Sequence, residues 1–244
     1  MSDKTTAVPA STLDGREFAM VSSTASDVSA DKPSVFRYHQ DGDMVWGEYT
    51  GDTVLLGRFA GRRDGNSITI GFAHSPSAGG SALLGTATSR IELGADGRML
   101  LIEDFEKDGV AHRSVCQEAE PSDAWELPSP SGDPLSLDAT SFLLETSSAS
   151  SVDGDSPTRF DFAERATIVW GTYYGDTVTT GHSVGVRTGS TLNEHFVHEL
   201  VTTGETLVGD SSTSVRTRED GVLELVEEFV LDGTPGRSVC VQVA

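Results

Sequence analysis

Three residue types that can exchange protons with a bound molecule recur at matching positions in the two halves of the chain. They are Tyr49, His74 and Glu103 in the first half and Tyr173, His198 and Glu227 in the second. A carboxyl group withdrawn from water beside an imidazole can give or take a proton near neutral pH, and a tyrosine hydroxyl can polarise a carbonyl. These six residues are therefore the candidates for catalysis, provided that the fold brings them together.

An internal repeat explains why each candidate occurs twice. Residues 45–54 return almost unchanged as 169–178, and the same offset places residues 113–116 on 237–240 without a gap. The repeat predicts two copies of one unit, and a chain of 244 residues gives each copy enough length to bury its own core. We expect a disordered lead-in at 1–11, a first domain at 12–118, a linker rich in Pro and Ser at 119–135 and a second domain at 136–244.

Short runs of alternating or β-branched residues, separated by Gly and Asp turns, predict an all-β fold. The first copy contains eight such runs, at 17–22, 35–40, 44–50, 53–62, 67–74, 82–92, 98–106 and 113–117. Tight turns make consecutive strands pair as a meander, and closing the meander removes its exposed edges. We therefore predict two tandem antiparallel up-and-down β-barrels, each wide enough for packed side chains or one small ligand.

Side chains alternate between the two faces of a strand, so the barrel interior can be assigned from the pattern. Glu103 lies between Leu101 and Phe105 on one face, and these apolar neighbours favour an inward orientation for all three. The alternative is that the glutamates lie at the barrel mouth or outside, the histidines bond to backbone carbonyls and the tyrosine hydroxyls face water, so that all of them have only a structural role. The phenylalanines expected to line a cavity are Phe72, Phe105, Phe196 and Phe229.

The orientation of two tryptophans stays open at this stage. Trp46 lies on the opposite face from Tyr49, and Trp170 repeats the arrangement. If the tyrosines face inward, the tryptophans face outward and can form the contact between the barrels. If the assignment is reversed, Trp46 and Trp170 line the pocket as binding residues.

A resemblance to a known family supports the barrel. The pattern comprises Phe36, Tyr38, Gln40, Gly42, Val45, Trp46, Gly47, Tyr49 and Gly51, followed by Gly57, Phe72, His74, Asp96, Gly97, Arg98 and Glu103. It resembles a small bacterial family whose members are often labelled N-acetylglutamate synthase-like. The second copy departs from the pattern with Phe162, Glu164 and Val222 in place of Tyr38, Gln40 and Arg98. The resemblance implies a compact barrel of lipocalin-like or avidin-like outline. It does not imply acetyl transfer, because no Gly-rich turn opens a helix to hold a coenzyme A pyrophosphate.

Charge and composition limit the partners. The net charge is -21, from 17 basic and 38 acidic residues, so nucleic acid and anionic membranes are excluded as partners by repulsion. No signal segment precedes the first copy and no apolar run approaches the ~18 residues of a membrane span, so we expect a cytoplasmic protein. Cys116 and Cys240 each lack a partner within their own copy and are expected to be buried thiols.

The second copy is richer in potential metal ligands than the first. It contains His182, Glu194, His195 and His198, whereas residues 69–71 of the first copy are Thr-Ile-Gly at the place of 193–195. The spacing of these ligands matches no tetrahedral zinc site. We therefore predict no metal and no cofactor.

Two functions remain open. In the first, a barrel binds a mostly apolar small molecule and guides a cofactor-independent cyclisation or isomerisation, as barrel-shaped cyclases of natural-product pathways do. In the second, the protein is a non-catalytic carrier, sensor or protein-interaction module with packed barrels. A cavity on the order of 300 Å³ or more, reached by Tyr, His and Glu, favours the first function. The first copy keeps the family pattern better and is the expected location of the site, and the oligomeric state stays open.

Overall fold

The computed structural model describes most of the chain as two β-barrels. The described residues are 11–25, 27–51, 53–107, 109–123, 125–148, 151–231 and 234–243, so the predicted lead-in lies almost entirely outside them. All regular secondary structure in these residues is β-strand. None of their segments forms a helix long and apolar enough to cross a membrane.

The first barrel closes through the pairing of its first and last strands. Its strands are β1 (Glu17–Ser23), β2 (Val35–Asp41), β3 (Met44–Gly51), β4 (Val54–Asp64), β5 (Ser67–Pro76), β6 (Leu83–Leu93), β7 (Met99–Lys107) and β8 (Val110–Ala119). Each strand pairs antiparallel with the next, and β8 returns to β1, where Glu17 lies opposite Ala119. The predicted all-β meander is therefore confirmed.

The second barrel repeats this topology. Its strands are β9 (Thr140–Ser147), β10 (Arg159–Arg165), β11 (Ile168–Tyr174), β12 (Val178–Thr188), β13 (Thr191–Leu200), β14 (Thr206–Thr217), β15 (Leu223–Leu231) and β16 (Thr234–Val243). The barrel closes where β16 pairs with β9. Two closed eight-stranded barrels in tandem thus follow from the sequence repeat.

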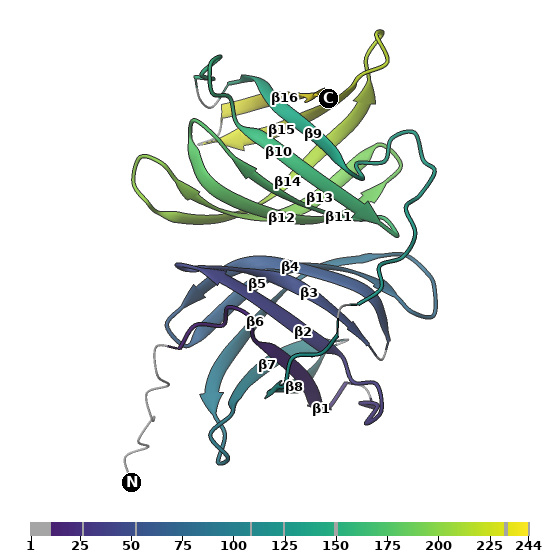
Figure 1. The fold of residues 1–244 in the computed structure, drawn as a ribbon, viewed down its shortest axis with the longest axis vertical. Helices are drawn as coiled ribbons and strands as arrows, with labels where there is room; N and C mark the ends of the chain where they lie inside the picture. Colours follow the sequence, from purple (N-terminus) through teal and green to yellow (C-terminus); the bar gives the residue numbers. More distant parts are fainter. Residues whose placement is uncertain are drawn as a thin grey trace.

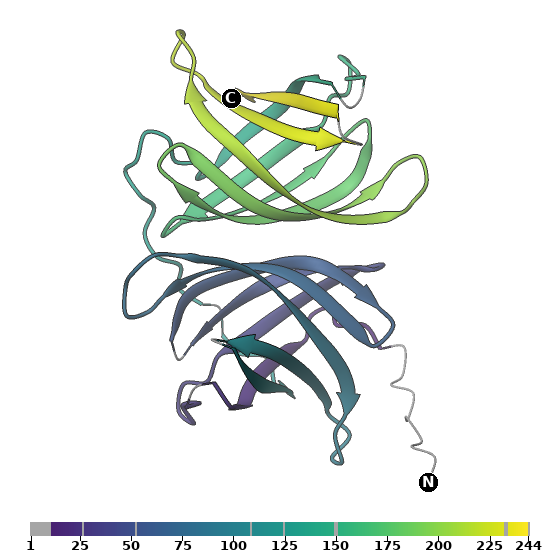
Figure 2. The same cartoon turned by 180° about the vertical axis from the view of Figure 1, so that it is seen from behind.

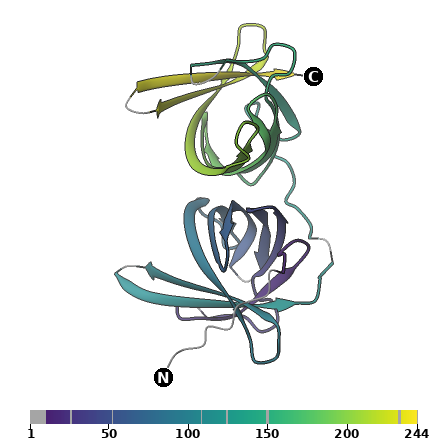
Figure 3. The same ribbon diagram turned by 90° about the vertical axis from the view of Figure 1, so that its left-hand side faces the viewer.

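The two barrels stack along the long axis of the molecule. Figure 1 shows the first barrel below the second, with β3, β4 and β5 facing β11, β12 and β13, and the view from behind in Figure 2 shows the same two layers. Figure 3 shows the two units from the side, one above the other, and strand pairing closes each of them. Each barrel therefore has an interior of its own and an outer wall that contacts the other barrel.

Equivalent residues make the contact between the barrels. The Trp46 ring stacks on His182 with centroids 3.9 Å apart, and the Trp170 ring lies under the Arg58 guanidinium at 4.2 Å. Trp170 repeats Trp46 and His182 repeats Arg58, so the same contact is made twice with the roles of the copies exchanged. The barrels are thus related by an approximate two-fold axis, and the tryptophans face outward.

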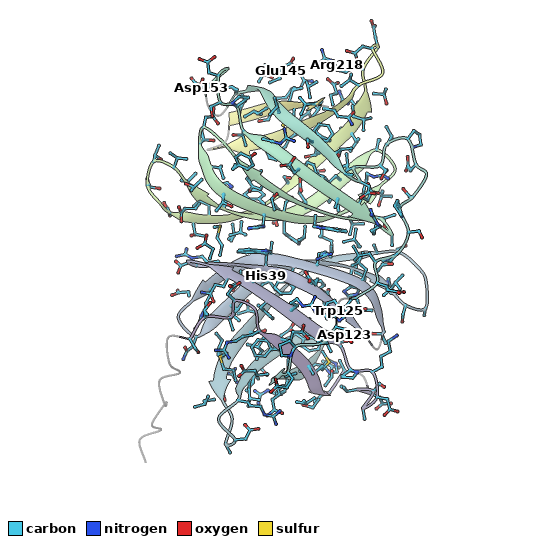
Figure 4. The ribbon with its side chains drawn as sticks, in the orientation of Figure 1. His39, Asp123, Trp125, Glu145, Asp153 and Arg218 are labelled. Carbon is cyan, nitrogen blue, oxygen red and sulfur yellow. The ribbon has the colours of Figure 1, made fainter. Side chains whose placement is uncertain are left out.

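The linker is attached to both barrels. On the first barrel, the Trp125 ring lies 4.6 Å from the Arg37 guanidinium, and the Ser122 hydroxyl donates a hydrogen bond to buried Glu17. On the second barrel, Arg187 donates a hydrogen bond of 2.9 Å to Asp133. Figure 4 labels Trp125 and Asp123 where the linker crosses the first barrel. Contacts at both of its ends thus fasten the linker to the two units that it joins.

Candidate functional site

Two of the three predicted residues meet directly inside each barrel. The Tyr49 hydroxyl on β3 and His74 Nδ1 on β5 share a hydrogen bond of 2.8 Å, and Tyr173 and His198 share one of 2.9 Å. Burial raises the pKa of both phenols well above the ordinary value and lowers the pKa of both imidazoles. Each Tyr–His pair is therefore held neutral near pH 7.

The third predicted residue faces inward but has separate partners. Burial raises the pKa of Glu103 and of Glu227, and their hydrogen-bond partners are Ser114 and Ser211. The charge of Glu103 also raises the phenol pKa of Tyr49, which places the carboxyl within electrostatic range of the Tyr–His pair. The glutamates therefore do not lie outside the barrels, although no hydrogen bond of the described residues joins them to the histidines.

Glycines on β4 and β12 leave room for the tyrosine rings. A Cβ atom at Gly57 would lie 2.3 Å from Cζ of Tyr49, and one at Gly181 would lie 2.3 Å from Cζ of Tyr173. Any larger residue would push the ring away from its histidine. The close approach of ring and backbone thus fixes where each hydroxyl points.

Large apolar side chains pack together inside the first barrel. Phe59 is fully buried, and its ring centroid lies 4.6 Å from that of Tyr38 and 6.4 Å from that of Tyr49. Ile68 and Ile70 pack into the same cluster. The Tyr49–His74 pair therefore lies beside a packed core.

The interior of the second barrel contains a cavity of about 260 Å³. Ser183 stands there in place of Phe59, and Glu194 in place of Ile70, so a large ring and an apolar branch are replaced by smaller or polar groups. The volume is near the lower end of the range for small-molecule pockets. The family pattern favoured the first copy as the location of the site, but this cavity lies in the second.

Glu194 is the most perturbed acid in this cavity. Burial, reinforced by the nearby charge of Glu227, raises its pKa to about 7. The Ser211 hydroxyl donates a hydrogen bond of 3.2 Å to Glu194 Oε1 and is also the partner of Glu227. One hydroxyl has only one hydrogen to donate, so it cannot satisfy both carboxylates at once. Glu194 can therefore hold or release a proton near neutral pH.

Of the aromatic residues predicted to line a pocket, Phe196 lines the cavity of the second barrel, and the others that the structure describes lie elsewhere. Phe196 lines the cavity and stacks on His198 at 5.4 Å, and Phe72 stacks on His74 at 5.7 Å in the first barrel. Phe105 stacks on His112. The side chain of Phe229 lies outside the described residues. Trp46 and Trp170 do not line the cavity; they border a separate space of about 190 Å³ between the barrels.

The possible metal ligands of the second copy do not converge. His182 stacks on Trp46, His195 pairs with Asp210, and His198 bonds to Tyr173. Among the residues that the structure describes, no group of three or more His, Cys, Asp or Glu side chains is arranged to hold a metal ion. Both cysteines are free, and burial raises the pKa of each thiol to about 12.

Sequence reasoning missed the roles of Ser183, Glu194 and Ser211. Their signal was the difference between the copies at inward positions, where Phe59, Ile70 and Ala87 stand in the first barrel. Taken alone, Glu194 in place of Ile70 indicates only a possible metal ligand. Taken together, the three changes reduce the side-chain volume and increase the polarity of the barrel interior, and this combination is the signal of the cavity.

Comparisons with curated proteins and solved structures give only distant likenesses. No curated protein matches the chain. Among solved structures, immune modulator A of Aeromonas veronii is 11% identical, with 93% of this chain and 92% of that chain covered and a TM-score of 0.32. A variant of transferrin-binding protein B from Haemophilus parasuis is 8% identical, with 87% and 66% covered and a TM-score of 0.29. At these TM-scores the two likenesses carry no argument about function.

A family model, in contrast, matches both copies. The family is described as avidin-like protein, and the matches cover residues 11–119 and 135–243. The lipocalin-like or avidin-like outline is thus confirmed as avidin-like, whereas no finding supports the N-acetylglutamate synthase-like label. Since the two matches together span most of the chain, this protein belongs to the avidin-like family, with one copy of the family fold in each barrel.

Proposed function

We propose that the second barrel binds a small, mostly apolar molecule in its cavity and that the first barrel is a filled structural partner. Avidin-like barrels bind small molecules, and the second barrel has an interior space that one can occupy. The observation that carries the proposal is the replacement of the buried Phe59 ring by Ser183 at the equivalent position.

The walls of the cavity indicate the size and character of the ligand. Phe160, Phe162 and Leu225 provide apolar surface, and Glu194, Glu227 and Ser211 provide a few polar groups that can fix an orientation. Pockets that bind small molecules combine these two features. A volume of about 260 Å³ suits a compact ligand, such as one carrying a single ring.

Native mass spectrometry of the purified full chain tests this function. We expect an adduct of constant mass on the wild-type protein and its loss in Ser183→Phe, which places a ring where the first barrel has one. Glu103→Gln is the matched control, because its carboxyl lies in the filled barrel, and it should retain the adduct. An adduct that persists in Ser183→Phe would contradict the proposal.

Acid–base catalysis is a second candidate, favoured by one observation. A carboxyl with a pKa of about 7 is suited to moving a proton at neutral pH, as a cofactor-independent isomerisation or cyclisation requires. If the bound molecule is a substrate, Glu194→Gln should abolish turnover while Glu103→Gln leaves it unchanged. Unchanged turnover in Glu194→Gln would exclude Glu194 as the acid–base group, and absence of turnover in the wild type would leave the protein as a carrier or sensor.

A further inference from the structure

The charged side chains that line the second-barrel cavity are all acidic. Glu194 and Glu227 are among the described lining residues, which include no Lys or Arg. His198 also lines the space, but it is bonded to Tyr173 and burial lowers its pKa, so it provides no positive charge near pH 7. A bound anion would therefore face two carboxyl groups without a compensating cation.

Hydrogen-bond acceptors outnumber donors around these carboxyls. The Ser183 and Ser211 hydroxyls are the side-chain partners of Glu194, and each has a single hydrogen to donate. Two ionised carboxylates together present about eight acceptor positions. An ammonium group brings three donors and no acceptor, so it complements this deficit better than a hydroxyl does.

Among the described residues that line the cavity, no other charged side chain competes for the two acids. The buried Arg187 on β12 pairs with Glu164 and Asp133 instead. Ser183 on β12 and Ser211 and Thr213 on β14 are neutral, and the Cys240 thiol on β16 stays protonated because burial raises its pKa to about 12. The remaining walls include the rings of Phe160, Phe162 and Phe196, whose faces attract cations. The cavity thus has one acidic region and an aromatic lining.

We propose that the second barrel selects an organic cation, a molecule with an apolar ring or chain and one protonated amino group. The inference rests on the proposed function and names the class of ligand. In the first barrel Ile70 and Ala87 replace Glu194 and Ser211, and Phe59 fills the space. The acid pair thus occurs in the second copy and not in the first, and the cavity of about 260 Å³ lies beside it.

Three ligands with one ring and different charges test the inference. We would titrate the full chain at pH 8 with benzylamine, benzyl alcohol and benzoate by calorimetry. The amino group of benzylamine, like that of lysine, carries a positive charge at this pH. We expect benzylamine to bind at least tenfold more tightly than benzyl alcohol, a difference of about 1.4 kcal/mol, and benzoate not to bind.

The Glu194→Gln variant removes one acidic charge and leaves the volume of the cavity nearly unchanged. The variant should lose at least tenfold in benzylamine affinity and keep its benzyl alcohol affinity within twofold, which also shows that the barrel is folded. Glu103→Gln should bind all three probes as the wild type does. If benzyl alcohol or benzoate binds as tightly as benzylamine, the cation inference is wrong. If that binding is also lost in Ser183→Phe, the proposed function still holds. Absence of binding by all three probes would overturn both.

Discussion

Ser183 and Phe59 occupy equivalent inward positions on β12 and β4, yet one borders a cavity and the other fills a core. The neighbouring change from Ile70 to Glu194 places a carboxyl where the first barrel has an apolar branch. A buried acid beside another acid resists ionisation, because both desolvation and the neighbouring charge oppose it. Two residue changes therefore account for both the space and the chemistry of the second barrel.

Exchanging the residues at these two positions should have unequal effects on stability. Phe59→Ser removes a buried ring and should lower the free energy of unfolding by about 3–5 kcal/mol. Ser183→Phe fills existing space but loses a hydrogen bond to Glu194, so its effect should stay within about 1 kcal/mol. Urea denaturation of both variants checks this. A larger loss in Ser183→Phe than in Phe59→Ser would mean that the second barrel is as well packed as the first.

The pKa of Glu194 predicts how stability depends on pH. Its folded value of about 7 lies above the ordinary 4.5, so the folded chain holds this proton more tightly than the unfolded chain in that range. The contribution of Glu194 to the free energy of unfolding should therefore fall as pH rises from about 4.5 to 7. Glu194→Gln should be more stable than the wild type at pH 8, by roughly 1–3 kcal/mol, and equally stable near pH 4. Thermal unfolding at both pH values measures the difference, and a destabilised variant at pH 8 would contradict it.

At the scale of the strand, β4 and β12 position the Tyr–His pairs through glycine. The rings of Tyr49 and Tyr173 lie directly over Gly57 and Gly181, and a phenylalanine stacks on the other side of each ring, with centroids 4.8 and 5.1 Å apart. Each tyrosine is therefore held between a strand backbone and an aromatic ring. The hydroxyl reaches its histidine only because both contacts are present.

Alanine in place of either glycine should lower stability, but only the substitution in the second barrel should weaken ligand binding. Gly57→Ala and Gly181→Ala both displace a tyrosine ring, and each should cost about 1–3 kcal/mol in the free energy of unfolding. Only Gly181→Ala alters a wall of the cavity, so only this variant should weaken benzylamine binding. Calorimetry and thermal unfolding of the two variants together provide the measurement. Equal loss of binding in both would argue against a site confined to the second barrel.

For the whole molecule, the approximate two-fold axis makes the inter-barrel surface self-complementary. Gly71 and His195 are equivalent residues that face each other across the contact, as residues near such an axis must. Burial lowers the pKa of His182 to about 4, so the imidazole that stacks on Trp46 is neutral at pH 7. The arrangement is that of a symmetric dimer joined by a linker.

Cutting the linker should therefore leave the halves together. A protease site placed at Pro130 lies between the anchors at Trp125 and Asp133 and disturbs neither. After cleavage, size-exclusion chromatography should show one species of unchanged size. Trp46→Ala with Trp170→Ala should let the cut halves separate. Halves that separate without these substitutions would mean that the linker, not the interface, holds the barrels together.

The repeat, the strand order and the closed barrels could be predicted because their signals are local. Alternating residues and Gly turns along β2 to β5 specify strands and hairpins, and an inward face containing Leu101 and Glu103 follows from the same alternation. The cavity could not be predicted in this way. Whether Ser183 leaves a space depends on side chains from several other strands, and whether Trp46 faces solvent or a second barrel depends on a contact between copies.

The number of binding sites per chain distinguishes one ligand-binding barrel from two. Because the cavity lies in the second barrel, titration calorimetry of benzylamine into the full chain should give one site per chain and none in Ser183→Phe. Two sites per chain, or one site that survives in Ser183→Phe, would contradict it.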